Sequence, residues 1–417
     1  MSYSKKMLES ISEGDLAQAS VHFNEALSQD LPEEKLQLAD NLFQIGFLEE
    51  ANELFKNLLE ENPEEDALKI SLAEIAIEED KIEEAFTWLE QVSPESDVYA
   101  QSLLTTADIY QMLGIPEVSE SKLKEAKVLL PTEPLIDLAL CELYFASEGY
   151  SQAIEAYMDL LKHYPSFDSP IDIDERIGVS LSRIGEYEEA IEFLEKSIEE
   201  KETIEKLFQL ALCYYQVKEN ERSISMLERV MSMDEEFHQV YYPLAQILYD
   251  EGRHEEALQI AEAGIMKNPY ETVLYHLASE SAYQLNQKDE ARQYLEEVIS
   301  LELDSDLSKL KLAEFLVKEE EFEDIIQIIS TLDNKEQGMA HWYLAQAHNG
   351  LEEFEKANDY YELAYPYMDI EADFLKDYGL FLREEGKLEE AKELLQKYLA
   401  EVPDDLMIVS LLENDRW

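Results

Sequence analysis

One short phrase recurs along the whole chain at a nearly constant interval. It reads GEYEEAIEFLEKSIEEK at 185–201, GRHEEALQIAEAGIMKNP at 252–269 and GKLEEAKELLQKYLAEVP at 386–403. Aligned on one position of the phrase, successive copies lie 32 to 37 residues apart, and most steps are 34 residues. The aligned residues are Ala19, Ala51, Ala85, Ser119, Ala153, Ala190, Ser223, Ala257, Ala291, Ile325, Ala357 and Ala391. Such a period predicts a repeat array, in which each repeat buries its apolar face against its neighbours.

Each repeat is predicted to consist of two helices. In 241–269, Tyr241, Leu244 and Leu248 follow helical spacing, and a second apolar run begins at Ala257. Gly252 lies between the two runs, where the chain must turn sharply, and Pro269 follows the second run because proline cannot continue a helix interior.

These residues resemble the tetratricopeptide repeat (TPR) family. The copy at 238–271 carries the family's apolar, small, glycine, alanine and proline positions, and those at 32–65, 171–203 and 372–405 match comparably. The matching residues are Tyr241, Leu244, Ala245, Leu248, Gly252, Ala257 and Pro269; Gly46, Ala51, Phe55 and Pro63; Gly185, Tyr187 and Ala190; and Gly386, Ala391 and Pro403. Three copies, near 66–99, 272–305 and 306–337, lack the glycine. The chain as a whole is similar to long acidic TPR proteins of Gram-positive bacteria.

The resemblance implies an all-α, TPR-type solenoid, a right-handed superhelix of about twelve helix-turn-helix repeats. The steps predict an N-terminal array of about five repeats at 1–165 and a C-terminal array of about seven at 166–403. The segment YPSFDSPIDID at 164–174, with two prolines and the 37-residue step, is read as a hinge or as a simple loop. Residues 404–417 are expected to form a capping helix, because a terminal repeat otherwise exposes its apolar face.

The charge of the chain excludes several kinds of partner. Against 95 acidic residues stand 33 basic ones, a formal net charge of −62. Nucleic acid and anionic membranes should repel such a chain, since binding them requires lysine and arginine. No apolar run reaches the roughly 20 residues of a membrane span, and no signal peptide is recognisable. With two cysteines, Cys141 and Cys213, and no C-x-x-C pair, we expect a cytoplasmic protein without disulfides or zinc.

No catalytic, metal or cofactor constellation is recognisable, so an enzyme is not expected. HEEAL at 254–258 lacks the second histidine of H-E-x-x-H, and His341 and His348 lie two helical turns apart. Cys141 occupies a small-residue position of its repeat, which favours a buried structural thiol.

Two sets of residues are candidates for partner binding. In the family, the residue after the small position of each first helix points to the inner surface. In the N-terminal repeats that residue is acidic four times, each 34 residues after the last, where the family usually has asparagine. The acidic set is Asp40, Glu74, Asp108 and Glu142. An aromatic set follows in the C-terminal repeats, where aromatic residues are also common in the family: Tyr215, Tyr249 and Tyr283, with Phe208, Tyr242 and His276 upstream.

The sequence therefore predicts a non-catalytic scaffold or adaptor that binds segments of other proteins, basic in character, in its concave groove. The alternative is a peptide-sensing regulator whose superhelix changes pitch on ligand binding. The partner, the pathway and the oligomeric state are not predicted.

Overall fold

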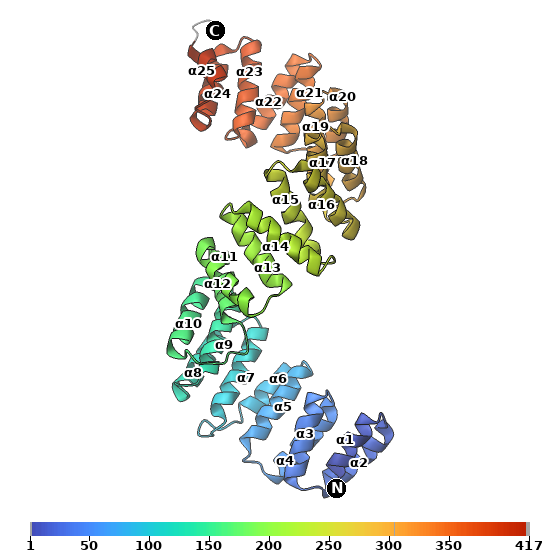
Figure 1. Ribbon diagram of the computed structural model, residues 1–417, viewed down its shortest axis with the longest axis vertical. Helices are drawn as coiled ribbons and strands as arrows, with labels where there is room; N and C mark the ends of the chain where they lie inside the picture. Colours follow the sequence, from blue (N-terminus) through green and yellow to red (C-terminus); the bar gives the residue numbers. More distant parts are fainter. Residues whose placement is uncertain (1, 304, 414–417) are drawn as a thin grey trace. The chain divides into compact units, whose positions relative to one another are not determined.

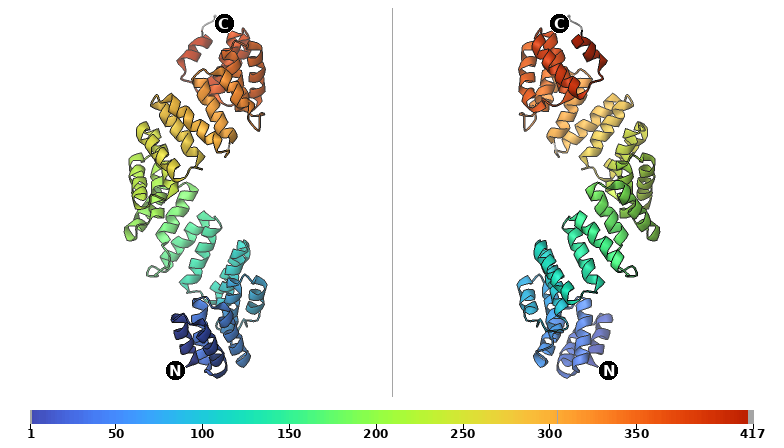
Figure 2. Two further views of the ribbon diagram at one scale, coloured as in Figure 1. Left: turned by 90° about the vertical axis from the view of Figure 1, so that its right-hand side faces the viewer. Right: turned by 90° about the vertical axis from the view of Figure 1, so that its left-hand side faces the viewer.

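The structure, a computed structural model, describes residues 2–303 and 305–413, and helix pairs succeed one another throughout this part of the chain (Figures 1 and 2). Within the described residues there are 25 α-helices, which form twelve antiparallel pairs and one additional C-terminal helix. The all-α fold of twelve helix-turn-helix repeats is thus confirmed. By the contacts between Cα atoms, the chain divides into an N-terminal unit, 1–202, and a C-terminal unit, 203–417.

The N-terminal unit contains six helix pairs. Its helices are α1 (Tyr3–Ser12), α2 (Leu16–Gln29), α3 (Pro32–Gln44), α4 (Leu48–Glu61), α5 (Asp66–Glu78), α6 (Ile82–Leu89), α7 (Tyr99–Met112), α8 (Pro116–Leu129), α9 (Pro134–Ala146), α10 (Tyr150–His163), α11 (Ile173–Ile184) and α12 (Tyr187–Glu200). The odd-numbered member of each pair is its first helix.

The C-terminal unit contains the other six pairs and the last helix. Its helices are α13 (Ile204–Gln216), α14 (Asn220–Met233), the 3₁₀ turn η1 (His238–Val240), α15 (Tyr241–Asp250), α16 (His254–Lys267), α17 (Thr272–Gln284), α18 (Lys288–Ser300), α19 (Ser305–Lys318), α20 (Phe322–Ser330), α21 (Gly338–Gly350), α22 (Phe354–Met368), α23 (Ala372–Glu384), α24 (Leu388–Glu401) and α25 (Leu406–Glu413).

The turn inside each pair uses a left-handed residue. Gly252 has φ 74°, as the sequence predicts. Six repeats have another residue at this turn, and it takes the same conformation, including Asp80, Asn286 and Glu320 with φ values of 59°, 62° and 58°. The other three are Glu148, Lys218 and Glu352. The turn geometry is therefore set by the packing of the two helices, and a non-glycine residue adopts it at a cost of about 1–2 kcal/mol.

Close contact between the two helices of a pair explains the small residues of the repeat. In α11, a Cβ atom added to Gly178 would come within 2.7 Å of Leu194 on α12. In α23, a Cβ atom added to Gly379 would come within 2.8 Å of Leu395 on α24. Each of these glycines lies twelve residues before the repeat's alanine, and in the other repeats this place is taken by alanine, cysteine or serine, except for Met7 in the first repeat. It is called the small position below.

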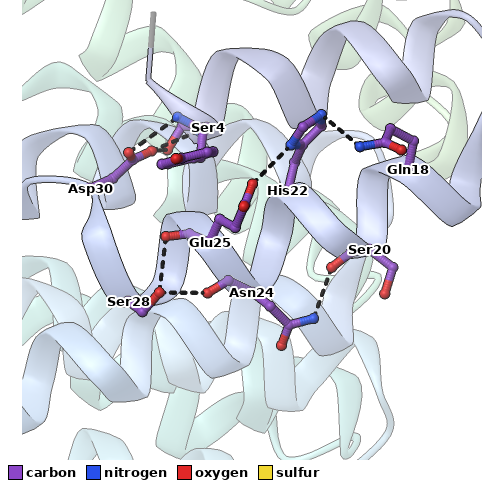
Figure 3. Close-up of polar contacts among 9 residues, drawn as sticks. Ser4, Gln18, Ser20, His22, Asn24, Glu25, Ser28 and Asp30 are labelled. Atoms are coloured by element: carbon purple, nitrogen blue, oxygen red, sulfur yellow. Dashed lines mark hydrogen bonds and ion pairs between the residues drawn. The ribbon is translucent and has the colours of Figure 1, made fainter.

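Polar side chains cap the first helix of the chain. Asp30, which follows α2, accepts hydrogen bonds from the backbone N–H groups of Tyr3 and Ser4, at 3.1 and 2.7 Å, and from the Ser4 hydroxyl at 2.7 Å (Figure 3). Burial alone would raise the pKa of Asp30, but the hydrogen bonds from Ser4 and Tyr3 lower it. The carboxylate thereby satisfies N–H groups that α1 cannot pair internally.

The last helix, α25, covers the apolar end of the final pair, as predicted for a capping helix. Ile408 is fully buried in a cluster with Leu395 and Tyr398 of α24, and Leu411 and Leu412 pack against the same cluster. Residues 414–417 of the predicted cap lie outside the described residues.

The predicted boundary at residue 165 stays a prediction, as does a hinge over 164–174. The segment lies between α10 and α11, inside the N-terminal unit, and contains a turn in which Phe167 N–H donates to the Tyr164 carbonyl at 3.0 Å.

Candidate functional site

Neighbouring first helices meet through two recurring positions. The residue after the small position is called the stripe position, and the residue two places before the next small position is called the facing position. In the C-terminal unit, Gln346 is at a stripe position and Asp377 is at the facing position of the following first helix. The Gln346 Nε2 atom donates to Asp377 Oδ2 at 3.0 Å. The two positions therefore lie within reach of a hydrogen bond.

At two other places, an acidic stripe residue meets a basic facing residue. Arg176 donates to both carboxylate oxygens of Glu142, at 3.0 and 3.1 Å, and the Tyr157 hydroxyl donates to the same carboxylate. Lys311 is 2.9 Å from Glu280. Glu142, which was predicted to contact a partner, is thus occupied by groups of its own chain.

The other three predicted acids lack such a cation. Asp40, Glu74 and Asp108 have no hydrogen bond or ion pair within the described residues. Their facing positions are taken by neutral residues, namely Ser71, Thr105 and Ala139. The two facing hydroxyls bond to carbonyls of their own helices, Ser71 to Ala67 at 3.4 Å and Thr105 to Gln101 at 3.2 Å.

The three carboxylates carry an electrostatic penalty in the free protein. Burial raises the pKa of Glu74, and the charges of Asp108 and Asp40 raise it further. Partial desolvation raises the pKa of Asp40 and Asp108 too, although both side chains remain exposed to solvent. A positive charge placed near these carboxylates would relieve this penalty.

The tyrosines of the aromatic set use their hydroxyls to connect neighbouring first helices. Tyr215 donates to Asp250 at 2.7 Å, and Tyr283 donates to Glu319 at 3.1 Å. The hydrogen bond to Asp250, together with burial, raises the pKa of Tyr215 to about 12. These two hydroxyls are bonded within the protein, and the rings of both tyrosines are half-buried.

The three upstream residues of the aromatic set differ from one another. Phe208 packs edge-to-face on Phe237, with 5.3 Å between ring centroids, and Tyr242 is 40% exposed. His276 is buried, and its Nε2 lies 2.9 Å from the Ser308 hydroxyl. Since His276 lies in the interior, we do not count it as part of an exposed surface.

Three residues of the aromatic set nevertheless converge on one cavity. Tyr249, His276 and Tyr283 line a cavity of about 220 Å³ between α15, α17 and α19 in the C-terminal unit. The other lining residues are Ser279, Glu280, Gln284, Leu295, Lys311, Glu314, Phe315 and Lys318. The sequence interpretation missed Glu280, Glu314 and Lys311, although the first two continue the stripe position of the acidic set.

The described residues were also searched for metal sites, a reactive cysteine and membrane-spanning helices. There, histidine, cysteine and acidic side chains form no group that could hold a metal ion. Burial, with the charges of Asp137 and Glu142, raises the pKa of Cys141 to about 12, so its thiol is a poor nucleophile. Over the same residues, the search for a helix that is long and apolar enough to cross a membrane finds none.

Solved structures of other repeat proteins resemble the chain in fold. A TPR protein with an unusual peptide-binding site, YrrB, is 17% identical over 45% of this chain and 95% of its own, with a TM-score of 0.39. The Cut9-Hcn1 hetero-tetramer of the APC/C is 14% identical over 97% of this chain and 94% of its own, with a TM-score of 0.43. TM-scores this low carry no functional argument.

Family profiles and a relative agree on the identity of the repeats. Profiles described as YpiA-like tetratricopeptide repeats match residues 111–164, and YpiA-like C-terminal tetratricopeptide repeats match 339–405. A general tetratricopeptide repeat profile matches 175–203. The TPR repeat-containing protein YpiA of Bacillus subtilis is 34% identical over 369 residues, which span 88% of this chain and 87% of YpiA. The chain belongs to the YpiA family of tetratricopeptide repeat proteins.

Proposed function

We propose that this protein is a non-catalytic interaction scaffold or adaptor whose N-terminal unit binds basic, extended segments of partner proteins. The observation that carries the proposal is the unpaired state of Asp40, Glu74 and Asp108. At the same stripe position, Glu142 and Glu280 are neutralised by a cation from the next first helix. We infer that a partner supplies the three missing cations.

The spacing of the acids restricts the shape of the partner segment. Packed helices lie about 8–10 Å apart, so successive stripe residues on neighbouring first helices are separated by roughly that distance. A polyproline II segment rises about 3.1 Å per residue with three residues per turn, so every third side chain returns to the same face after about 9 Å. The best fit is an extended segment with lysine or arginine at every third position.

The charge of the whole chain supports such a partner. A net charge of −62 accelerates the approach of cationic segments and disfavours polyanions such as nucleic acid. We also propose that the protein is cytoplasmic, because its two cysteines form no disulfide, which suits a reducing compartment. The rings of Tyr215, Tyr249 and Tyr283, with Phe208 and Tyr242, are proposed as a second contact surface in the C-terminal unit.

The test is a binding measurement on the intact chain with a charge-matched control. The probe is a peptide with four repeats of Lys-Pro-Ser, and its comparison peptide has the same composition with the lysines contiguous. The acidic variant combines Asp40→Asn, Glu74→Gln and Asp108→Asn. Its control combines Glu53→Gln, Glu60→Gln and Glu155→Gln, which change three exposed acids on second helices that have no ion pair among the described residues.

At low salt, the acidic variant should associate more slowly with the spaced peptide than the control does, and its rate should depend less on salt. Equal rates and salt slopes for the two variants would identify the acidic set as ordinary solvated surface. Capture from a lysate of the source cell with both variants then finds the partner as the protein lost only from the acidic variant. A free peptide that compacts the array in X-ray scattering would favour the peptide-sensing regulator instead.

A further inference from the structure

The cavity between α15, α17 and α19 has the size of one side chain. Its volume is about 220 Å³. An apolar cavity of about 150 Å³ already accommodates benzene, whereas pockets that enclose a drug-sized ligand measure about 300–1,000 Å³. Leu295 and Phe315 are 3% and 6% exposed and make an apolar floor, while Tyr249 and Tyr283 stand half-buried beside it. One aromatic side chain would fit this space.

A hydroxyl in the wall of the cavity makes no hydrogen bond to the described part of the protein. Ser279 lines the cavity and is 4% exposed, yet it has no hydrogen bond within the described residues. It does not bond to the carbonyl four residues before it, as Thr105 does in α7. A serine hydroxyl both donates and accepts, and a bound group that covers it without bonding to it leaves it unpaired at a cost. The hydroxyl is therefore available to a polar atom that enters the cavity.

The charged residues around the opening are balanced. Lys311 lies 2.9 Å from Glu280 and 3.7 Å from Glu314, and Lys318 lies 2.8 Å from Glu314. Two lysines thus neutralise two glutamates, unlike the unpaired acids of the N-terminal unit. A cationic or anionic side chain would have to break one of these ion pairs, so the opening favours a neutral group.

We propose that this cavity binds one tyrosine side chain of a partner, with its ring against Tyr249 and against the edge-to-face pair of Tyr283 and Phe315, and with the phenol hydroxyl bonded to Ser279. A phenylalanine would fill the same space but would leave the Ser279 hydroxyl unpaired. A lysine or arginine would meet carboxylates that are already neutralised. The inference rests on the proposed function only in that a partner protein supplies the side chain.

The test uses isolated side-chain probes, so it does not depend on any partner or on the acids of the N-terminal unit. The probes are the N-acetyl amides of tyrosine, phenylalanine, tryptophan and arginine. Binding to the full chain is followed by the methyl NMR signals of Leu295, with those of Leu54 in the N-terminal unit as a reference. The tyrosine probe should bind most tightly and should shift Leu295 but not Leu54.

Two serine variants on α17 isolate the hydroxyl. Ser279→Ala removes the group in the cavity, and Ser281→Ala removes a fully buried, unpartnered hydroxyl that does not line it. Ser279→Ala should weaken the tyrosine probe about two- to twelvefold, the equivalent of one neutral hydrogen bond, and leave the phenylalanine probe unchanged. Ser281→Ala should retain the wild-type preference.

The selectivity of the wild-type chain alone can overturn the proposal, whether or not a variant folds. Equal binding of the tyrosine and phenylalanine probes, tighter binding of the tryptophan or arginine probe, or no shift of Leu295 would each do so. If the probes behave as expected but the acidic variant binds the spaced peptide normally, the proposed function fails and the cavity assignment stands. If the probes do not behave as expected but the acidic variant binds the spaced peptide more slowly, the cavity assignment fails and the proposed function stands.

Discussion

A single substitution, Ser71→Lys, should give the N-terminal unit the ion pairs that Lys311 makes in the C-terminal unit. Lys311 follows Glu280 by 31 residues and precedes Glu314 by three, and it lies 2.9 and 3.7 Å from their carboxylates. Ser71 has the same spacing from Asp40 and from Glu74. The two local sequences are also alike, DALKISLAE from residue 66 and DLSKLKLAE from residue 306.

The expected gain is about 1 kcal/mol. Two partly exposed ion pairs contribute roughly 0.2–1 kcal/mol each, and part of this is offset by fixing the lysine side chain. Only the weak 3.4 Å bond from Ser71 to Ala67 is lost. The control Ser71→Met adds a similar unbranched stem and a similar helix propensity without the charge. We expect the lysine variant to exceed the methionine variant by about 1 kcal/mol.

Urea unfolding at low salt is the suitable assay, because urea does not screen charges as guanidinium chloride does. The advantage of lysine over methionine should shrink as salt is added. Amide exchange in α3 and α5 should slow in the lysine variant, which places the effect in the correct repeats.

The pH dependence supplies an independent measurement. Since the folded-state pKa of Glu74 is raised above its unfolded value, the group binds protons more readily when folded. Its contribution therefore makes the free protein less stable as pH rises from about 4.5 through the folded pKa. Ser71→Lys should lower the NMR titration midpoint of Glu74 and weaken this trend. If the midpoint did not move and the two variants were equally stable, the facing position would not lie where the repeat geometry puts it.

Three further predictions concern the rest of the chain. Lys311→Met should destabilise the C-terminal unit by about 1 kcal/mol or more in urea, because it leaves Glu280 unpaired. The control Lys392→Met, at an exposed lysine with no ion pair among the described residues, should cost less. Glu148→Gly should raise stability by up to about 1 kcal/mol, because Glu148 has φ 58°, a left-handed conformation that glycine adopts without strain. Ser147→Gly, at φ −86°, should not raise it. Equal effects of the two substitutions in thermal melting would contradict this. Truncation after Pro403 removes α25 and exposes the apolar contacts of Ile408, so amide exchange in α24 should accelerate; unchanged protection there would show that α25 is no cap.

Much of the fold was predictable because each repeat solves the same packing problem. The small position must admit a neighbouring helix, as Gly178 and Gly379 show, and the turn needs a left-handed residue. The repeats that lack the glycine were predictable as well, since Asp80 and Asn286 adopt the turn under the constraint of the two helices that they connect.

The candidate site was only partly predictable, because pairing between repeats depends on two positions at once. By its spacing, Glu142 is equivalent to Asp40, Glu74 and Asp108. Only its contact with Arg176 in the structure shows that its charge is neutralised. Likewise, Tyr283 is aromatic by the family pattern, and its hydroxyl proves to be bonded to Glu319. The helical position of His276 in the sequence did not predict that its side chain is buried.

The contrast between the two ends of the stripe suggests why the facing position carries specificity. Stripe residues are acidic in both units, so acidity alone does not distinguish a stripe carboxylate that is unpaired from one that its own chain neutralises. The facing residue makes the distinction: Ser71 leaves Asp40 and Glu74 unpaired, and Lys311 neutralises Glu280. If the proposed function holds, one substitution at this position would open or close a binding site without disturbing the packing of the pair, because the small position and the turn lie elsewhere in the repeat. A repeat protein can therefore change what it binds, one repeat at a time, while it keeps its fold.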